Sequence, residues 1–475
     1  LLEPEKGEVS QFKADKHNPR AIHYNDILSI YEDYTGTLWF GTDGAGLSYY
    51  DEYLEKFNSI INSQVPDEIH VDVVRAIEKD ADGYLWIGTS GKGLMRYNPQ
   101  LGTWKKYVAN TGYPELKSDR IMSLLADSQG LWIGTQGGGL SLLKKNGGWL
   151  HFNSLEGFGL NAITIWDIHR DRKGRTWLAT REYGLLEFNR SEGVIRSYNA
   201  KASPEMPVFE NVRAIAEDAG GNLWLGGDSE GLILLNPDQG RYREFRSEPS
   251  ENSLPNDKIK SLYPAPDGTL WIGTNGSGLA ALEPETGVFH TYSTGDGLAN
   301  NVIYAVLPDD SGHLWLSSNR GISRFTPPPN WEEAPEIINY TNYEGLATEF
   351  NTGAAYRHTD GTIYFGGLEG FYWFRPESIE NNPHLPKTAI TRVSLADESL
   401  PLQPGLELDY RANTLSFTFS AMQFSLPKEI EYRYRLVNYD EDWVFAGNTP
   451  FARYSFLPPG DYEFQVQASN YDGVW

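Results

Sequence analysis

Apolar and polar residues alternate along most of this chain in short runs, and turns rich in glycine and aspartate separate the runs. Such alternation predicts half-buried β-strands, because successive side chains of a strand point to opposite faces of a sheet. Examples are Val212-Arg213-Ala214-Ile215 and Gly287-Val288-Phe289-His290-Thr291-Tyr292. The spacing of three and four that predicts amphipathic helices is absent from these runs. The pattern therefore predicts an all-β protein.

The predicted strands recur in a repeated unit, D-x-x-G-x-L-W-I-G-T-x-G-x-G-L. Its aromatic position is occupied in turn by Trp39, Trp86, Trp132, Trp177, Trp224, Trp271, Trp315 and Tyr364, at intervals of 47, 46, 45, 47, 47, 44 and 49 residues. Four short strands in a period of about 45 residues are typical of one blade of a β-propeller. We expect each motif tryptophan to wedge between blades and each motif aspartate to cap its turn.

The period ends near Pro376, and alternating strands of a second domain follow. We expect a β-propeller over residues 1–376, a linker over 377–386, and a small immunoglobulin-like β-sandwich over 387–475 that is truncated at its C-terminus. The eight motif copies allow seven or eight blades. Leu1 to Phe12 could complete the eighth copy to give eight blades, or the last seven copies could close a ring while the first belongs to an upstream propeller. We expect the chain to be part of a longer protein.

Composition and charge narrow the range of functions. A net charge of −24, with a pI near 4.8, argues against binding to nucleic acid or docking on an anionic membrane surface. The chain has no Cys, which excludes disulfides and thiolate chemistry. Its nine histidines show no metal-ligand spacing, and neither a nucleophile elbow nor a phosphate-binding loop occurs. We expect no catalytic residue, metal or cofactor, although a carboxylate pair acting across a propeller face stays open.

The repeats resemble those of the two component regulator propeller family, and the tail resembles the Y_Y_Y domain that follows such propellers. The tail residues that carry this resemblance are Tyr432-x-Tyr434-x-Leu436, Trp443, Leu457-Pro458-Pro459-Gly460-x-Tyr462 and Asn470-x-Asp472-Gly473-x-Trp475. The resemblance implies the periplasmic sensor region of a transmembrane receptor. It also implies a membrane helix after the tail, then a histidine kinase, often a hybrid, or a diguanylate cyclase. Members of the family often carry two successive propellers, and carbohydrate is the ligand that the family implies.

Residues with a specific function are expected where the copies differ. The position after the first apolar residue of each innermost strand holds Leu28, Arg75, Met122, Trp166, Arg213, Lys260, Tyr304 and Ala354 in turn. Loops between second and third strands open on the same face. Aromatic faces stack on sugar rings, and guanidinium groups bind carboxylate or sulfate. The predicted site for a neutral or anionic oligosaccharide consists of Arg75, Trp166, Arg181, Tyr183, Arg213, Lys260, Tyr304 and Arg320. An ordinary packing role for these residues is an equal alternative.

Three functions stay open at this stage. The leading one is a ligand-sensing domain that forms a homodimer through the sandwich and passes a signal to a membrane helix, which requires two states that bind the ligand differently. The alternatives are a propeller-fold glycoside hydrolase or polysaccharide lyase, and a protein-interaction scaffold. The Y_Y_Y-like tail favours signalling.

Overall fold

The computed structural model describes residues 2–3, 8–9, 11–15, 21–109, 116–152, 163–199, 209–250, 252–346, 349–396, 398–409 and 411–475. Within these ranges every regular element is a β-strand except five single-turn 3-10 helices, η1 (Glu52–Leu54), η2 (Asn62–Gln64), η3 (Thr294–Asp296), η4 (Asn342–Glu344) and η5 (Pro376–Ser378). The all-β prediction is therefore confirmed. No helix in this part of the chain has the length and apolar character needed to cross a membrane. The chain divides into two compact units, Lys56–Ser378 and the combination of Leu1–Glu55 with Ile379–Trp475.

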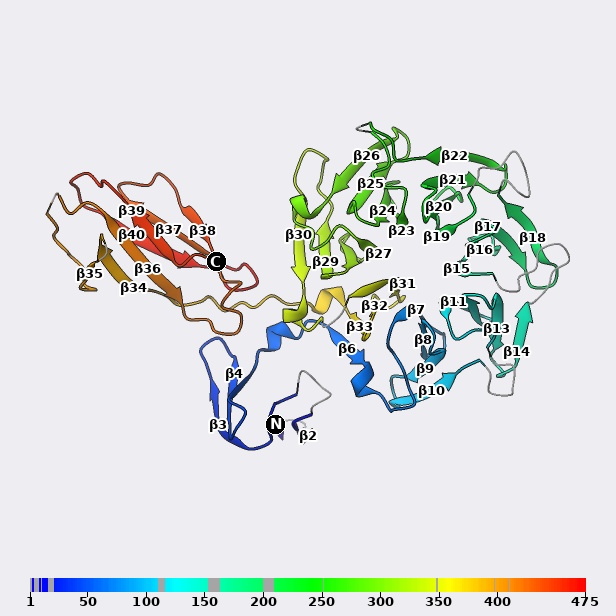
Figure 1. The fold of residues 1–475 in the computed structure, drawn as a ribbon, viewed down its shortest axis with the longest axis horizontal. Helices are drawn as coiled ribbons and strands as arrows, with labels where there is room; N and C mark the ends of the chain where they lie inside the picture. Colours follow the sequence, from blue (N-terminus) through cyan, green and yellow to red (C-terminus); the bar gives the residue numbers. More distant parts are fainter. Residues whose placement is uncertain are drawn as a thin grey trace. The chain divides into compact units, whose positions relative to one another are not determined.

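The unit Lys56–Ser378 is a β-propeller, a ring of seven four-stranded antiparallel sheets (Figure 1). In each sheet the innermost strand lies at the centre of the ring and the following strands lead outward. Six blades use consecutive strands: β7 (Val74–Lys79), β8 (Leu85–Thr89), β9 (Leu94–Asn98) and β10 (Thr103–Tyr107); β11 (Ile121–Asp127), β12 (Gly130–Thr135), β13 (Leu140–Lys144) and β14 (Trp149–Phe152); β15 (Ile165–Arg170), β16 (Thr176–Thr180), β17 (Leu185–Asn189) and β18 (Gly193–Tyr198); β19 (Val212–Glu217), β20 (Leu223–Gly227), β21 (Leu232–Asn236) and β22 (Arg241–Phe245); β23 (Ile259–Pro264), β24 (Leu270–Thr274), β25 (Leu279–Glu283) and β26 (Val288–Tyr292); β27 (Ile303–Pro308), β28 (Leu314–Ser318), β29 (Gly321–Thr326) and β30 (Glu336–Tyr340).

The seventh blade closes the ring with a strand from the other end of the unit. It combines β31 (Phe350–Arg357), β32 (Ile363–Gly367) and β33 (Gly370–Phe374) with β6 (Asn58–Ile61) as its outermost strand. Asn58 lies opposite Trp373, and Ile61 lies opposite Gly370. This pairing gives seven blades. The eight-bladed alternative, in which Leu1 to Phe12 completes the last blade, is wrong because β6 occupies that place.

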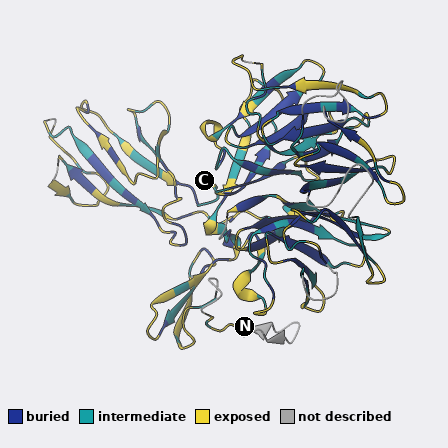
Figure 2. Ribbon diagram, turned by 45° about the vertical axis from the view of Figure 1, so that its right-hand side comes forward, coloured by how far each residue is buried: buried dark blue, intermediate teal, exposed yellow. Residues whose placement is uncertain are grey.

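The first motif copy lies outside the ring. It forms a separate three-stranded sheet of β3 (Ile27–Glu32), β4 (Leu38–Thr42) and β5 (Leu47–Tyr50), and the short strands β1 (Leu2–Glu3) and β2 (Glu8–Val9) pair with each other. Leu47 of this sheet is 68% exposed, whereas the corresponding leucines of five ring blades, Leu94, Leu140, Leu185, Leu232 and Leu279, are 0% exposed. Figure 2 shows the same contrast between the exposed sheet and the buried strands of the ring. The copy therefore has the blade motif without the packing of a ring blade.

The C-terminal part is a β-sandwich, as predicted. One sheet contains β34 (Thr388–Leu395), β35 (Glu398–Leu400), β36 (Leu415–Ala421) and β39 (Phe451–Tyr454), and the other contains β37 (Tyr432–Val437), β38 (Val444–Gly447) and β40 (Glu463–Ala468). Phe417 and Phe419 from the first sheet pack with Tyr432 and Leu436 from the second in a shared core. The sandwich and the first motif copy belong to one compact unit, in which the Tyr49 hydroxyl donates to the carbonyl of Ser425 at 2.9 Å.

The segment predicted as a linker is packed against the sandwich. The backbone N–H of Asn382 donates to Oδ2 of Asp472 at 2.7 Å, and Nδ2 of Asn470 donates to the carbonyl of Asn382 at 2.5 Å. Asn382 and Asn470 are both fully buried. The Asn-x-Asp-Gly sequence near the end of the chain therefore fixes the entry into the sandwich.

The structure explains why the motif pairs aspartate with tryptophan. In the blade of β7–β10, Oδ1 of Asp80 accepts backbone N–H groups of its turn, while Oδ2 accepts Nε1 of Trp86 at 2.7 Å. The corresponding indole bonds to Asp127, Asp171 and Asp309 are each 2.9 Å long. Tryptophan also meets aromatic rings of its own blade and the next, as Trp132 does with Phe152 and Phe188. The predicted wedge and cap are confirmed, and one carboxylate links them.

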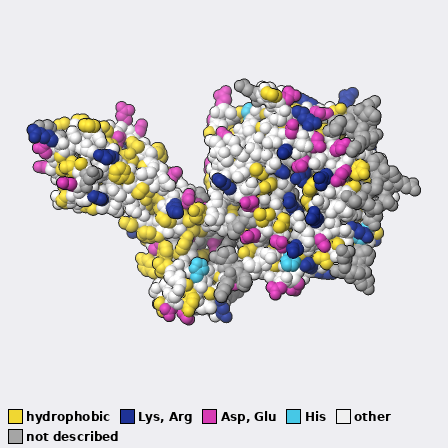
Figure 3. Space-filling view, in the orientation of Figure 1, with side chains coloured by type: hydrophobic (Ala, Val, Ile, Leu, Met, Phe, Trp, Pro, Cys, Tyr) yellow, Lys and Arg dark blue, Asp and Glu magenta, His cyan; other side chains and the backbone are white. Residues whose placement is uncertain are grey.

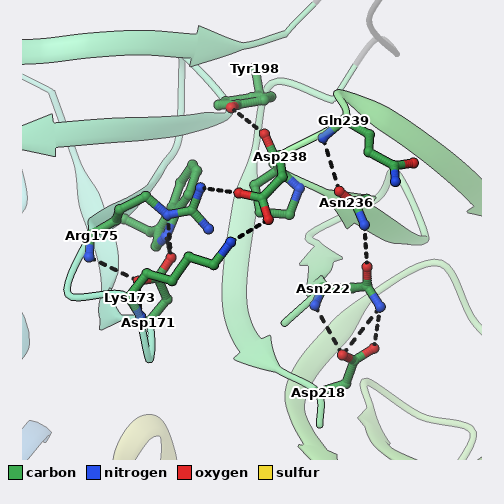
Figure 4. A network of polar contacts seen from close by, with 11 residues as sticks. Asp171, Lys173, Arg175, Tyr198, Asp218, Asn222, Asn236, Asp238 and Gln239 are labelled. Carbon is green, nitrogen blue, oxygen red and sulfur yellow. Dashed lines mark hydrogen bonds and ion pairs between the residues drawn. The ribbon is translucent and has the colours of Figure 1, made fainter. Parts of the chain in front are cut away.

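Polar contacts join neighbouring blades at their outer turns. Asp238, in the turn after β21, accepts hydrogen bonds from Lys173 at 2.5 Å and from Nη1 of Arg175 at 3.0 Å (Figure 4). Nε of Arg175 also donates to Asp171, the turn-capping residue of its own blade, at 2.6 Å. These cations are thus paired with carboxylates, which contrasts with the centre of the ring.

Candidate functional site

A β-bulge gives six of the seven innermost strands of the ring one extra residue at the same place. In the first ring blade Val74 pairs with Thr89 and Ala76 pairs with Gly88, so Arg75 has no partner on the neighbouring strand. The same shift occurs in the next five blades. Bulges redirect a side chain and are frequent beside functional sites. The variable positions noticed in the sequence are these bulge residues: Arg75, Met122, Trp166, Arg213, Lys260 and Tyr304.

The bulge residues line a cavity of about 220 Å³ at the centre of the ring. Five of the eight predicted site residues lie on its wall: Arg75, Trp166, Arg213, Lys260 and Tyr304. Figure 3 shows Lys and Arg side chains gathered over the middle of this face. In the seventh blade the register shift spans several residues, and Thr352 and Gly353 line the cavity there, whereas Ala354 is buried.

Two contacts hold the side chain of Arg213. Its Nε donates to Oδ1 of Asp228 at 2.9 Å, and its guanidinium lies 4.1 Å from the centre of the Trp166 ring. Trp166 in turn donates from Nε1 to Oδ1 of Asn211 at 3.2 Å. Cation–π stacking and a charged hydrogen bond together orient the guanidinium before any ligand binds.

The two other cations of the cavity have no carboxylate partner among the residues that the structure describes. Nε of Arg75 is buried and has no hydrogen-bond partner there, and Lys260 forms no ion pair there. Burial lowers the pKa of Arg75, and the charge of Arg213 lowers it further. Burial also lowers the pKa of Lys260, with added repulsion from Arg213 and Arg75 that Asp228 partly opposes. The cavity wall therefore concentrates positive charge in an acidic protein.

Tyr304 completes the rim beside the cations. Its hydroxyl donates to Oδ1 of Asn319 at 2.7 Å, which leaves the oxygen free to accept. Burial raises the pKa of Tyr304, as does the charge of Glu349. The phenol therefore stays neutral and can offer its ring and its oxygen to a ligand.

Two half-buried carboxyls on the cavity wall, Glu78 and Asp167, were not predicted from the sequence. Burial raises the pKa of Glu78 to about 8, although a hydrogen bond from the Tyr356 hydroxyl opposes the shift. Burial also raises the pKa of Asp167, whose Oδ2 accepts the backbone N–H of Ile215 from the next blade at 3.0 Å. Both residues follow the bulge on an innermost strand. Their position on a strand that faces the cavity is the feature that could have identified them.

The remaining three predicted residues lie away from the cavity wall. Arg181 and Arg320 are exposed on loops between second and third strands. Tyr183 packs against a hydrophobic cluster that includes Trp132 and Phe188, so its ring belongs to the contact between blades. Within the described residues, no group of three or more His, Asp or Glu side chains is arranged to hold a metal ion.

Comparison with protein families identifies both parts of the chain. Residues 22–44, 69–91, 115–137, 253–276 and 297–320 match the two component regulator propeller, and residues 423–475 match the Y_Y_Y domain. The chain therefore carries two component regulator propeller repeats followed by a Y_Y_Y domain. The first matched repeat is the copy outside the ring.

Several of the similar proteins come from signalling systems. The extracellular domain of the hybrid two component system BT3049 from B. thetaiotaomicron superposes with a TM-score of 0.79 and 25% identity, over 98% of this chain and 62% of that chain. A stretch of 38% of this chain is 29% identical to histidine kinase P4 of Formosa agariphila and covers 14% of that protein. The chain thus spans less than two thirds of these proteins. Virginiamycin B lyase from Staphylococcus aureus, with 15% identity and a TM-score of 0.51 over 67% of this chain, shares the fold alone.

Proposed function

We propose that this chain, with its propeller repeats and Y_Y_Y domain, is the extracytoplasmic ligand-sensing region of a transmembrane signalling receptor. An oligosaccharide binds at the cavity in the ring, and the sandwich passes the signal to a membrane helix that follows it. The output module is a histidine kinase, often a hybrid, or a diguanylate cyclase. The receptor works as a homodimer that meets through the sandwich region.

The observation that carries this proposal is the likeness to the BT3049 extracellular domain, which extends over 98% of this chain and includes both units. The Y_Y_Y match adds a second, independent resemblance to signalling proteins. The likeness to the lyase gives no support for catalysis, because at 15% identity it reflects the propeller fold alone.

The assignment of the ligand site rests on the meeting of several predicted residues in one cavity. Five predicted residues from five different blades reach one cavity, whereas the motif residues around them serve packing. Ligand sites are concave and combine apolar side chains with a few convergent polar groups, and the wall of this cavity has both. Signalling further requires that the ligand bind two states of the receptor with different affinity.

A thermal-shift screen of oligosaccharides on the purified chain tests the proposal, because a ligand at a hundredfold excess over its Kd adds about 2.7 kcal/mol of stability. Calorimetry then compares the best ligand on the natural chain and on Arg213→Ala, with Arg320→Ala as a control that removes an exposed charge from a loop outside the cavity. We expect at least a tenfold loss for Arg213→Ala and less than a twofold change for the control. Equal affinity for all three proteins would contradict the site, and steady release of reducing ends from the ligand would indicate a hydrolase instead.

A further inference from the structure

We propose that the group recognised in the cavity is an oxyanion, a carboxylate or sulfate, and that Arg75, Arg213 and Lys260 bind it together. The inference rests on the proposed function and narrows its ligand from oligosaccharides in general to acidic ones. It excludes a neutral sugar that stacks on Trp166 as the main mode of binding.

The first argument is the balance of charge. Three cations line the cavity, and Asp228 is paired with only one of them, Arg213. The two carboxyls on the wall, Glu78 and Asp167, form no ion pair with these cations among the described residues, and burial raises the pKa of each, which favours the uncharged form. At the outer turns, by contrast, Arg175 is paired with both Asp171 and Asp238 (Figure 4). Partly buried charges without partners are unfavourable, since water is removed and nothing replaces it. An anion in the cavity restores the balance that the protein itself leaves open.

The second argument is the orientation of Arg213. Asp228 holds Nε, and Trp166 supports the face of the guanidinium, yet the terminal nitrogens make no hydrogen bond within the described part of the chain. The planar fork of a guanidinium matches the two oxygens of a carboxylate or sulfate. Trp166 is therefore a positioning residue, because one face of its ring supports Arg213 and its Nε1 is bonded to Asn211.

The third argument is the size of the cavity. Its volume of about 220 Å³ is smaller than the 300 Å³ or more of typical ligand pockets, so it admits an anionic group with part of a sugar ring and no whole oligosaccharide. The three cations come from β7, β19 and β23, which are the innermost strands of three different blades. They therefore surround one anion from different directions. The rest of the saccharide lies over the mouth, beside Tyr304.

Sodium sulfate is the probe for the anion alone. Its effect on melting temperature is measured at constant ionic strength on the natural chain and on Arg75→Met and Lys260→Met. The controls Arg181→Met and Arg320→Met remove the same charge from exposed loops outside the cavity. We expect sulfate affinity to fall at least tenfold in the two cavity variants and less than twofold in the controls. Without sulfate, both cavity variants should melt no lower than the natural chain, because an unpaired cation is removed. The same response to sulfate in all five proteins would overturn the inference.

Oligogalacturonides and their methyl esters separate an acidic sugar from a free inorganic anion. We expect the free acids to compete with sulfate and to bind at least tenfold more tightly than the esters. Equal binding of acid and ester, lost in Arg213→Ala, would overturn the inference and leave the proposed function standing. Sulfate binding with no competition from an acid or an ester would support the anion site and contradict an oligosaccharide as the sensed ligand.

Discussion

The half-buried carboxyl of Glu78 predicts how stability depends on pH. Replacing Glu78 with Gln gives a side chain of the same shape that never carries charge. Its carbonyl oxygen can still accept the hydrogen bonds that Glu78 receives from the Tyr356 hydroxyl and the backbone N–H of Ala126. The variant therefore removes the titration and keeps the packing.

The magnitude follows from the difference between the folded and unfolded states. The pKa of Glu78 is about 8 in the folded state, against 4.5 for a glutamate in water. Between these values the folded state binds the proton more tightly, so the free energy of unfolding falls as pH rises from 4.5 to 8 and is constant above that window. Each pH unit corresponds to about 1.36 kcal/mol, which sets an upper limit of about 5 kcal/mol on the loss.

The assay is urea unfolding of the natural chain and of Glu78→Gln between pH 5 and pH 9. We expect the variant to match the natural chain near pH 5 and to exceed it by several kcal/mol at pH 9. Other groups, Asp167 among them, titrate in both proteins and cancel in the difference. Glu192→Gln, at an exposed position, serves as the control and should follow the natural chain. Parallel profiles for the natural chain and Glu78→Gln would refute the reasoning.

Two further predictions concern the construction of the ring. Asp171→Asn weakens both the turn cap and the bond to Trp177, and should lower the free energy of unfolding by about 2 kcal/mol. A double-mutant cycle with Trp177→Phe measures the interaction energy between Asp171 and Trp177. Additive effects of the two substitutions would contradict the link between turn cap and tryptophan. A chain that starts just before β6 should keep a cooperative thermal transition for the ring, whereas one that also lacks β6 should lose it, because β33 would then have an open edge; equal transitions in calorimetry would show that β6 is dispensable.

The sequence was sufficient for the repeat, the class of fold and the roles of its constant residues. The period of the tryptophans predicts blades, and the turns and aromatic contacts around Asp80, Trp86 and Trp132 confirm those roles. The number of blades could not be predicted from the sequence. Closure of the ring depends on the pairing of Asn58 with Trp373, and these residues lie far apart in the chain. The sequence of neither strand identifies its partner, because short apolar runs of this kind can pair with many others.

Site residues could be predicted from the sequence where the backbone conformation places them in the cavity. They could not be predicted where their role depends on burial in the assembled ring. Arg75 and Arg213 stand at bulges that recur at a fixed place in the repeat, so reading the variable position was enough. Tyr183 also lies in a variable loop, but its ring packs against a neighbouring apolar cluster and does not reach the cavity. In the sequence Glu78 does not differ from the many surface carboxylates of this chain, and only the assembled ring removes it from water.

The closing strand also bears on how the ring can be handled as a module. The chain enters the ring through β6 and leaves it after β33, and these two strands are paired with each other. A domain whose two ends lie side by side can be placed within a surface loop of a host protein with little disturbance to the host. Residues 56–378 could therefore be grafted between the halves of a split fluorescent or enzymatic reporter. Binding of the proposed ligand at the cavity would then be read directly as light or turnover, without the rest of the chain.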